Sequence, residues 1–355
     1  MKKTRISRRQ ALKAAGGLLA SSAFSTRVVA DAPPAEAVTP GLIEAAKKEG
    51  QVIHYTSTDL PVAEKLGKAF EAKYPGIAVR VERTGAERVF QRIGQEYSSN
   101  IHAVDVVNSS DAAHFIVWKR DGILDPYVPE DVAKFYPVEH KDPDGLFASW
   151  RIFLSIIAYN TNLVKAEDAP KSFADLLDPK WKGKIVKAHP GYSGTNMTAT
   201  YQLQRELGWG WFEQLAKQNV MQVQSASDPP KKLELGERAI MADGTEYNIL
   251  QMKEAGRPVE PVYALEGSPM IVGPNGIFKG SPNPNAARLF QSFCFSREAQ
   301  QLIIDIGALR SAHPQTTEKP GRIPLHDIKS LKDDPAAVES QGSAIKTRYT
   351  RIFRV

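Results

Sequence analysis

The sequence predicts an α/β protein in which mostly parallel sheets carry helices on both faces, arranged as two lobes. The first observation is a strand–helix unit that occurs three times in succession between residues 51 and 121. The second is that each strand ends in a polar loop suited to capping the helix that follows. The third is that the pattern stops near residue 122 and resumes at residue 151, in a chain whose 355 residues suffice for two domains.

The elements of the first half follow from local patterns. Thr39 and Pro40 are typical of an N-cap and a first helical position, and Gly50 is the expected end of that helix. Apolar residues that run together or alternate predict strands at 51–55, 77–81 and 104–107. Residues 31–38, rich in alanine and proline, are expected to form a flexible arm.

The second half repeats this alternation of strands and polar loops. A long apolar strand is predicted first, and shorter strands follow, so that the set is 151–160, 184–188, 220–224 and 239–242. No repeat of 20–50 residues is present. Ligands of such sheets bind at the carboxyl ends of the strands, where the helix N-termini also point.

The basic charge of the chain belongs mostly to its first 30 residues. They hold seven of the 46 basic residues and no acid, which leaves 39 basic against 40 acidic residues in the remainder. A nucleic-acid-binding function therefore loses its electrostatic support. No uncharged apolar run reaches 18 residues, so the sequence predicts no transmembrane helix.

Residues 1–30 have the pattern of an export signal. A basic start is followed by a weakly apolar stretch and by Val28-Val29-Ala30, whose small residues predict cleavage before Asp31. Arg8 and Arg9, flanked by Ser7 and Leu12-Lys13, resemble a twin-arginine motif. A general secretory signal is the alternative. The single cysteine, Cys294, lies in an apolar helical stretch and is interpreted as a buried thiol.

Several motifs resemble the periplasmic solute-binding proteins of ABC importers, and most closely the group of ferric-ion-binding proteins. The most specific are Trp181-Lys182-Gly183-Lys184, within residues 172–185, and Pro284-Asn285-Ala286-Ala287, within residues 281–290. Further matches lie at 159–162, 267–270, 276–278 and 296–302, so the resemblance covers roughly residues 48–315.

This resemblance implies a two-lobed periplasmic-binding-protein fold of type II, with the ligand in the cleft. Each lobe would hold a mixed, mostly parallel sheet flanked by helices. Lobe 1 would comprise 39–150 plus 265–315, and lobe 2 would comprise 151–264 plus 316–355. The implied function is a periplasmic, monomeric binding subunit that delivers a small solute to an inner-membrane permease and its ATPase, with no cofactor and no nucleic-acid partner.

Three other functions stay open at this point. They are a carrier of ferric iron or an iron chelate, a ligand sensor that acts with a membrane kinase, and an exported enzyme. The enzyme hypothesis lacks a nucleophile–base motif, a dinucleotide loop and metal-spaced histidines, so we expect no catalytic activity. Ferric-binding relatives use a histidine in the first loop and two adjacent tyrosines. Here those positions have no histidine and only one tyrosine, and an iron set would be Asp59, Glu246 and Tyr247.

The cleft loops are instead rich in hydroxyls that precede helices, which favours a small organic anion such as a phosphonate, phosphate ester or carboxylate. Arg151 would form a bidentate clamp on the acid group, with a salt bridge at the lobe junction as the alternative. Tyr192 and Tyr247 would stack or donate hydrogen bonds. The complete predicted set is Ser57, Thr58, Asp59, Thr84, Ser109, Ser110, Arg151, Tyr192, Ser193, Gly194, Thr195, Ser225, Glu246 and Tyr247.

The export signal gives the first testable prediction. We expect the exported protein to begin at Asp31, and replacement of Arg8 and Arg9 by lysine to block export, because the twin-arginine route requires both guanidinium groups. N-terminal sequencing and cell fractionation measure these outcomes. Exported protein that still begins at Met1, or export unchanged by the double substitution, would contradict the prediction.

Overall fold

A computed structural model describes residues 32–355. The predicted leader at 1–30 lies outside the described residues. The strands in chain order are β1 (Gln51–Thr56), β2 (Ala78–Arg83), β3 (Val106–Asn108), β4 (Leu124–Asp125), β5 (Ala148–Asn160), β6 (Ile185–Ala188), β7 (Met221–Val223), β8 (Ile240–Thr245), β9 (Val259–Val262), β10 (Ser268–Phe278) and β11 (Ser330–Leu331).

Helices alternate with these strands, as the sequence predicts. They are α2 (Pro40–Glu49), α3 (Leu60–Lys73), α4 (Ala86–Ser98), α5 (Ala112–Arg120), α6 (Glu130–Phe135), α7 (Gly194–Ala216), α8 (Asp228–Glu234), α9 (Glu246–Glu254), α10 (Pro284–Phe295), α11 (Arg297–Gly307) and α12 (Pro335–Phe353). Short 3-10 turns lie at Val138–His140, Ala166–Asp168, Ala174–Leu177, Pro179–Trp181 and Leu325–Asp327. Among residues 32–355 no helix has the length and apolarity needed to cross a membrane.

Local capping chemistry explains where several helices begin. The Thr39 hydroxyl accepts a hydrogen bond from Leu42 N and Gly50 takes a left-handed conformation, so α2 begins and ends as predicted. Asp111 caps α5 by accepting from Ala113 N, and Ser193 caps α7 by accepting from Asn196 N. Polar residues at the ends of strands therefore cap the helices that follow them.

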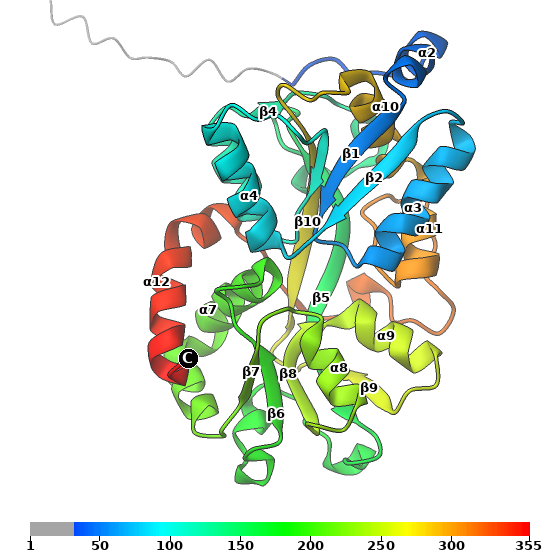
Figure 1. The fold of residues 1–355 in the computed structure, drawn as a ribbon. Helices are drawn as coiled ribbons and strands as arrows, with labels where there is room; N and C mark the ends of the chain where they lie inside the picture. The colour runs from blue at the N-terminus through cyan, green and yellow to red at the C-terminus, as the bar shows by residue number, and fades with distance from the viewer. Residues whose placement is uncertain (1–31) are drawn as a thin grey trace, which may run out of the picture. The chain divides into compact units, whose positions relative to one another are not determined.

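The strands form two parallel sets joined by two long antiparallel strands (Figure 1). The first strand set is β2–β1–β3, the second is β8–β6–β7, and β10 and β5 lie between them in the order β2-β1-β3-β10-β5-β8-β6-β7. All pairings inside each set are parallel, and those that β10 and β5 make are antiparallel to β3, to each other and to β8. The α/β class is thus confirmed. The sequence favoured two facing sheets over one continuous sheet, but the ladder is unbroken because β5 and β10 are long enough to pair on both sides.

One strand boundary differs from the prediction. The strand expected at 239–242 continues to Thr245, so Asp243 lies within β8 rather than in a loop. The reason is a buried ion pair between Asp243 and Lys187 of the neighbouring β6. Residues 32–38, where we expected a flexible arm, include Glu36, whose backbone pairs with Val128 and Glu130.

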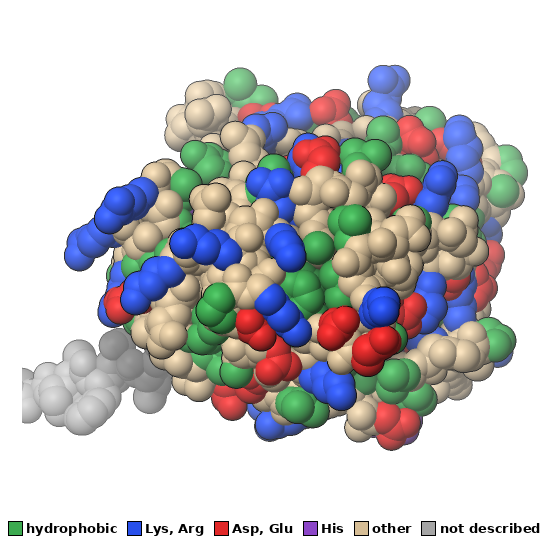
Figure 2. All heavy atoms as spheres, turned by 90° about the horizontal axis from the view of Figure 1, so that it is seen from below, with side chains coloured by type: hydrophobic (Ala, Val, Ile, Leu, Met, Phe, Trp, Pro, Cys, Tyr) green, Lys and Arg blue, Asp and Glu red, His purple; other side chains and the backbone are tan. Residues whose placement is uncertain are grey.

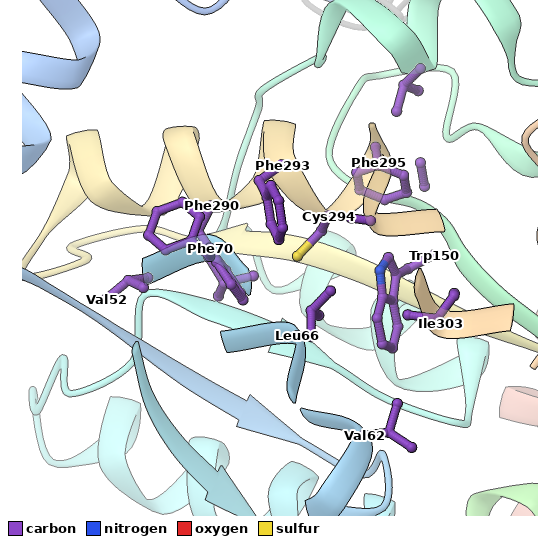
Figure 3. Packing of buried hydrophobic residues seen from close by; sticks show 14 of the residues in the cluster. Val52, Val62, Leu66, Phe70, Trp150, Phe290, Phe293, Cys294, Phe295 and Ile303 are labelled. Atoms are coloured by element: carbon purple, nitrogen blue, oxygen red, sulfur yellow. The ribbon is translucent and has the colours of Figure 1, made fainter. Parts of the chain in front are cut away.

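A buried aromatic core supports the first strand set (Figure 3). The face of α10 carrying Phe290, Phe293 and Cys294 packs against Phe70 of α3. The Phe70 ring makes edge-to-face contacts with Phe290 at 5.1 Å and with Phe293 at 5.5 Å. The Cys294 thiol is fully buried in this cluster, as the sequence indicates, and burial raises its pKa well above the usual value.

The surface seen from below in Figure 2 carries basic side chains interspersed with acidic ones.

A buried ion-pair network holds the middle of the fold. Arg310 donates two hydrogen bonds to Glu246, at 3.0 and 2.7 Å, and its backbone pairs with Ile152 of β5. Tyr263 donates a third hydrogen bond to the same carboxylate. Burial alone would raise the pKa of Glu246, but Arg310 and Arg322 bring it below its usual value. The network ties α9 to β5 and to the segment after α11.

We expect Arg310→Met to lower the free energy of unfolding by about 3–5 kcal/mol, because the buried Glu246 carboxylate then loses its closest cationic partner and keeps only the longer ionic contact with Arg322. The matched control, Lys253→Met, removes the exposed pair with Glu260 and should cost under about 1 kcal/mol. Chemical denaturation measures both.

The same pair predicts a pH dependence of stability. Since the pKa of Glu246 is lowered on folding, its stabilisation is complete above the unfolded value of about 4.3 and is lost as the pH falls through the folded value. Equal losses in Arg310→Met and Lys253→Met at pH 7 would show that the pair adds little.

Candidate functional site

A cleft of about 560 Å³ lies at the carboxyl ends of the strands and draws residues from both strand sets. The first set contributes the loops that follow β1, β2 and β3, and the second contributes the loops that follow β6 and β7 together with the start of α9. Arg151 of β5 lies between them. This is the edge of the fold where the sequence predicts a ligand.

Ten of the predicted site residues line this cleft. They are Ser57, Asp59, Thr84, Ser110, Arg151, Tyr192, Ser193, Thr195, Ser225 and Tyr247. The structure adds charged and amide side chains that the sequence reasoning did not single out, namely Arg83, Glu87, Arg88, Gln91, Gln224 and Asp228. A signal for Arg83 was present, since it lies between the strand predicted at 77–81 and the predicted site residue Thr84.

Three predicted residues are near the cleft but do not line it. The Thr58 hydroxyl donates to Asn108 Oδ1 at 2.9 Å, and the Ser109 hydroxyl pairs with His114 Nδ1 at 3.0 Å, so both side chains serve the loops themselves. Gly194 begins α7 and packs against the first strand set: a Cβ placed on it would lie 2.5 Å from Asp111 Cβ and 3.2 Å from Ala86 Cβ. The sequence placed Gly194 in the ligand site, whereas in the structure it lets the start of α7 approach the starts of α4 and α5.

Glu246 is not part of the cleft lining. Its side chain points into the interior, where Arg310, Arg322 and Tyr263 occupy its oxygens. The iron set of Asp59, Glu246 and Tyr247 is therefore not assembled. Among residues 32–355, no three His, Cys, Asp or Glu side chains are grouped to hold a metal.

Arg151 is the most unusual group of the cleft. Its side chain is only 1% exposed, and Nη2 donates to Ser57 Oγ at 3.0 Å. Its Nε and Nη1 have no hydrogen-bond partner in the described part of the chain. The alternative role predicted for Arg151 was a salt bridge at the lobe junction. Arg151 forms no salt bridge within residues 32–355, and the nearby carboxylate Glu246 pairs with Arg310 instead. Burial lowers the pKa of Arg151, as expected for a cation without a buried counter-ion.

The groups near Arg151 are hydroxyl and amide donors, a second arginine and one carboxylate, Asp59. Ser57 Oγ accepts from Ser110 N at 2.9 Å as well as from Arg151, so it connects two loops to the guanidinium. Arg83 Nη2 lies 3.6 Å from Asp59 Oδ1, and Asn248 donates to Asp59 Oδ2 at 2.7 Å, so this carboxylate already has partners. Burial raises the pKa of Tyr247 far above its usual value, despite the nearby Arg151 and Arg83, so its hydroxyl stays protonated.

The far wall of the cleft is more open. Tyr192 is 56% exposed, and Ser193 uses its hydroxyl to cap α7. The Ser225 hydroxyl pairs with that of Ser227 at 2.9 Å, and Ser225 N donates to Asp228. This wall presents polar groups at two helix N-termini, which favour a partly negative occupant.

Comparison with known proteins agrees with this fold and cleft. The family model described as "Bacterial extracellular solute-binding protein" matches residues 56–301, so the chain belongs to that family. Iron uptake protein A1 of Synechocystis is 25% identical over 329 residues, covering 89% of this chain and 87% of the relative.

Solved structures share the architecture. The periplasmic binding protein AfuA from Actinobacillus pleuropneumoniae, with exogenous fructose-6-phosphate bound, aligns with a TM-score of 0.79 at 24% identity, covering 86% of this chain and 99% of AfuA. Iron-bound HitA from Pseudomonas aeruginosa aligns with a TM-score of 0.73 at 22% identity, covering 85% of this chain and 99% of HitA. The predicted two-lobed fold and the resemblance to ferric-binding proteins are confirmed. Proteins that share this fold bind different ligands, so the fold alone does not identify the ligand, and the residues of the cleft have to.

The close approach at Gly194 gives a further prediction. We expect Gly194→Ala to destabilise the protein by about 1–3 kcal/mol, because the new methyl group would overlap Asp111 Cβ. Gly210→Ala, which lies just beyond the break in α7 at Gly208, has nothing within 4 Å of the new atom and should stabilise by about 0.5–1 kcal/mol. Denaturant titration compares the two, and similar changes in both variants would remove the role given to Gly194.

Proposed function

We propose that this protein is the periplasmic binding subunit of an ABC importer, and that it captures a small organic acid such as a phosphate ester, phosphonate or carboxylate. In this proposal the protein is exported by the twin-arginine route, cleaved near Ala30 and acts as a monomer that delivers its solute to a membrane permease and ATPase. The family membership supports solute binding. The observation that carries the choice of ligand is Arg151.

The buried position of Arg151 is unfavourable by itself. A guanidinium that is 1% exposed, with two nitrogens lacking acceptors, is unfavourable for folding unless another gain offsets it. An anionic group in the cleft that reached the guanidinium would accept hydrogen bonds from it, and each charge-assisted bond contributes about 1.5–3 kcal/mol. The Arg151 guanidinium is thus positioned to bind an acidic group.

The surroundings support an acid over a metal ion. Arg83 and Arg151 face Asp59 and Tyr247, and their positive charge opposes the binding of a further cation. Hydroxyls of Ser57 and Ser110 add donors beside the guanidinium. Fructose-6-phosphate, the ligand in the AfuA structure, belongs to the same chemical class as the solute proposed here.

The long strands β5 and β10 are the proposed hinge. Both pass between the two strand sets, and the register of β10 against β5 shifts at Gly273-Pro274. We assign the lobes as the sequence predicted, 39–150 plus 265–315 and 151–264 plus 316–355, with closure bringing Gly194 against Asp111. Sheet irregularities of this kind are suited to a bend between rigid halves.

Replacing Arg151 by methionine tests the proposal. We expect the affinity for an acidic probe to fall at least about 100-fold, since two or more charge-assisted hydrogen bonds are lost. The free energy of unfolding should stay equal or rise, because an unpaired buried charge is removed. Calorimetric titration with fructose 6-phosphate, methylphosphonate and succinate, each against a neutral analogue, gives the affinities.

The control is Arg257→Met, which removes an exposed arginine paired with Glu234 and should leave binding unchanged. Equal binding of acids and neutral analogues, or full affinity in Arg151→Met, would refute the proposed ligand class. Ferric iron bound in stoichiometric amount, with a visible charge-transfer band lost in Tyr247→Phe, would establish the metal instead.

A further inference from the structure

The C-terminal helix α12 brings a cation to the rim of the cleft. The helix packs along α7 and α5, and its residues Val338 and Ile345 are buried with Ala113, Met197 and Tyr201. In Figure 1 it runs beside α7 at the side of the molecule. Because α7 follows the second strand set and α5 the first, the side chain of Lys346 is held where both meet.

Lys346 contacts a carboxylate in the wall of the cleft. Its Nζ lies 3.2 Å from Glu87 Oε1, although the two residues are 259 positions apart. Glu87 belongs to the first turn of α4 and lines the cleft. Its other oxygen lies 3.7 Å from His114 Nε2. Burial alone would raise the pKa of Glu87, but His114 and Lys346 together lower it to about 2, so the group is charged at neutral pH.

A charged Glu87 opposes the proposed ligand. A carboxylate in the wall repels an acid bound at Arg151. His114 Nε2 lies 3.7 Å from both Glu87 and the buried Asp111, whereas Lys346 reaches Glu87 from outside this cluster. Lys346 is therefore the cation that the C-terminal helix adds to offset Glu87.

We propose that Lys346 determines the charge specificity of the cleft by neutralising Glu87, so that the C-terminal helix is part of the binding site. This inference rests on the acid-binding function proposed above. Lys346 acts through Glu87 and is a positioning and charge-compensating residue, without contact to the solute.

The test combines substitutions that separate charge from packing. We expect Lys346→Met to weaken binding of fructose 6-phosphate, methylphosphonate or succinate, whichever the wild type binds, roughly five- to tenfold. Glu87→Gln should bind the same acid as tightly as the wild type does, or more tightly. The double variant Glu87→Gln/Lys346→Met should regain wild-type affinity, because no charge is left to neutralise.

Arg348→Met is the matched control. It removes the same charge from the same helix, two residues away, where the side chain pairs with Glu213 on α7, and its affinity should equal that of the wild type. Equal weakening in Arg348→Met, or no recovery in the double variant, would show a general or structural effect and overturn the inference.

A measurement without ligand keeps the two proposals distinct. Carboxyl-carbon NMR, assigned by the loss of one signal in Glu87→Gln, should show a higher pKa for Glu87 in Lys346→Met than in the wild type. An unchanged pKa overturns the role of Lys346. Failure of all three acids to bind the wild type overturns the proposed function, and with it this inference.

Discussion

The cleft of this protein is built around a buried arginine that has no carboxylate partner among the described residues, Arg151 on strand β5. Arg151 is placed by β5, a strand buried along its whole length. Strand β10 pairs with its first half, and β8 and β9 pair with opposite edges of its second half. The packing around Arg151 is specific: a Cβ on Gly273 would lie 2.9 Å from Arg151 Nε. Burying Arg151 does not stabilise the fold, since an unpaired buried charge is unfavourable. The packing of the remaining fold has to offset the free-energy cost of burying this charge.

A second buried arginine shows the contrast. Arg310 is equally inaccessible, yet Glu246 and Glu318 accept its hydrogen bonds. The backbone of Arg310 pairs with Ile152, the residue after Arg151, yet only the Arg310 guanidinium has carboxylate partners within the described residues. Physical chemistry therefore separates a structural role for Arg310 from a proposed binding role for Arg151, although both side chains are buried and positive.

The cleft also depends on a part of the chain that comes last. α12 contacts helices that follow both strand sets, and Lys346 reaches a carboxylate of the cleft wall. Relatives with the same architecture carry names that refer to iron or to a sugar phosphate. Since the backbone scaffold is shared, a few charged side chains at the cleft and its rim are enough to change which ligand is favoured.

The sequence by itself determined the local structure and the family. Helix caps such as Thr39 and Ser193 bond to groups two or three residues away, so spacing along the chain reveals them. The loops at the strand ends were predictable for the same reason, and ten of the fourteen predicted site residues line the cleft. Only the tertiary structure decided what each charge does. Glu246 was predicted for the cleft but pairs with Arg310, 64 positions away, and Glu87 takes its partner from the last helix. Ionic partners are chosen by distance in space and by burial, and neither quantity can be read from spacing in the sequence.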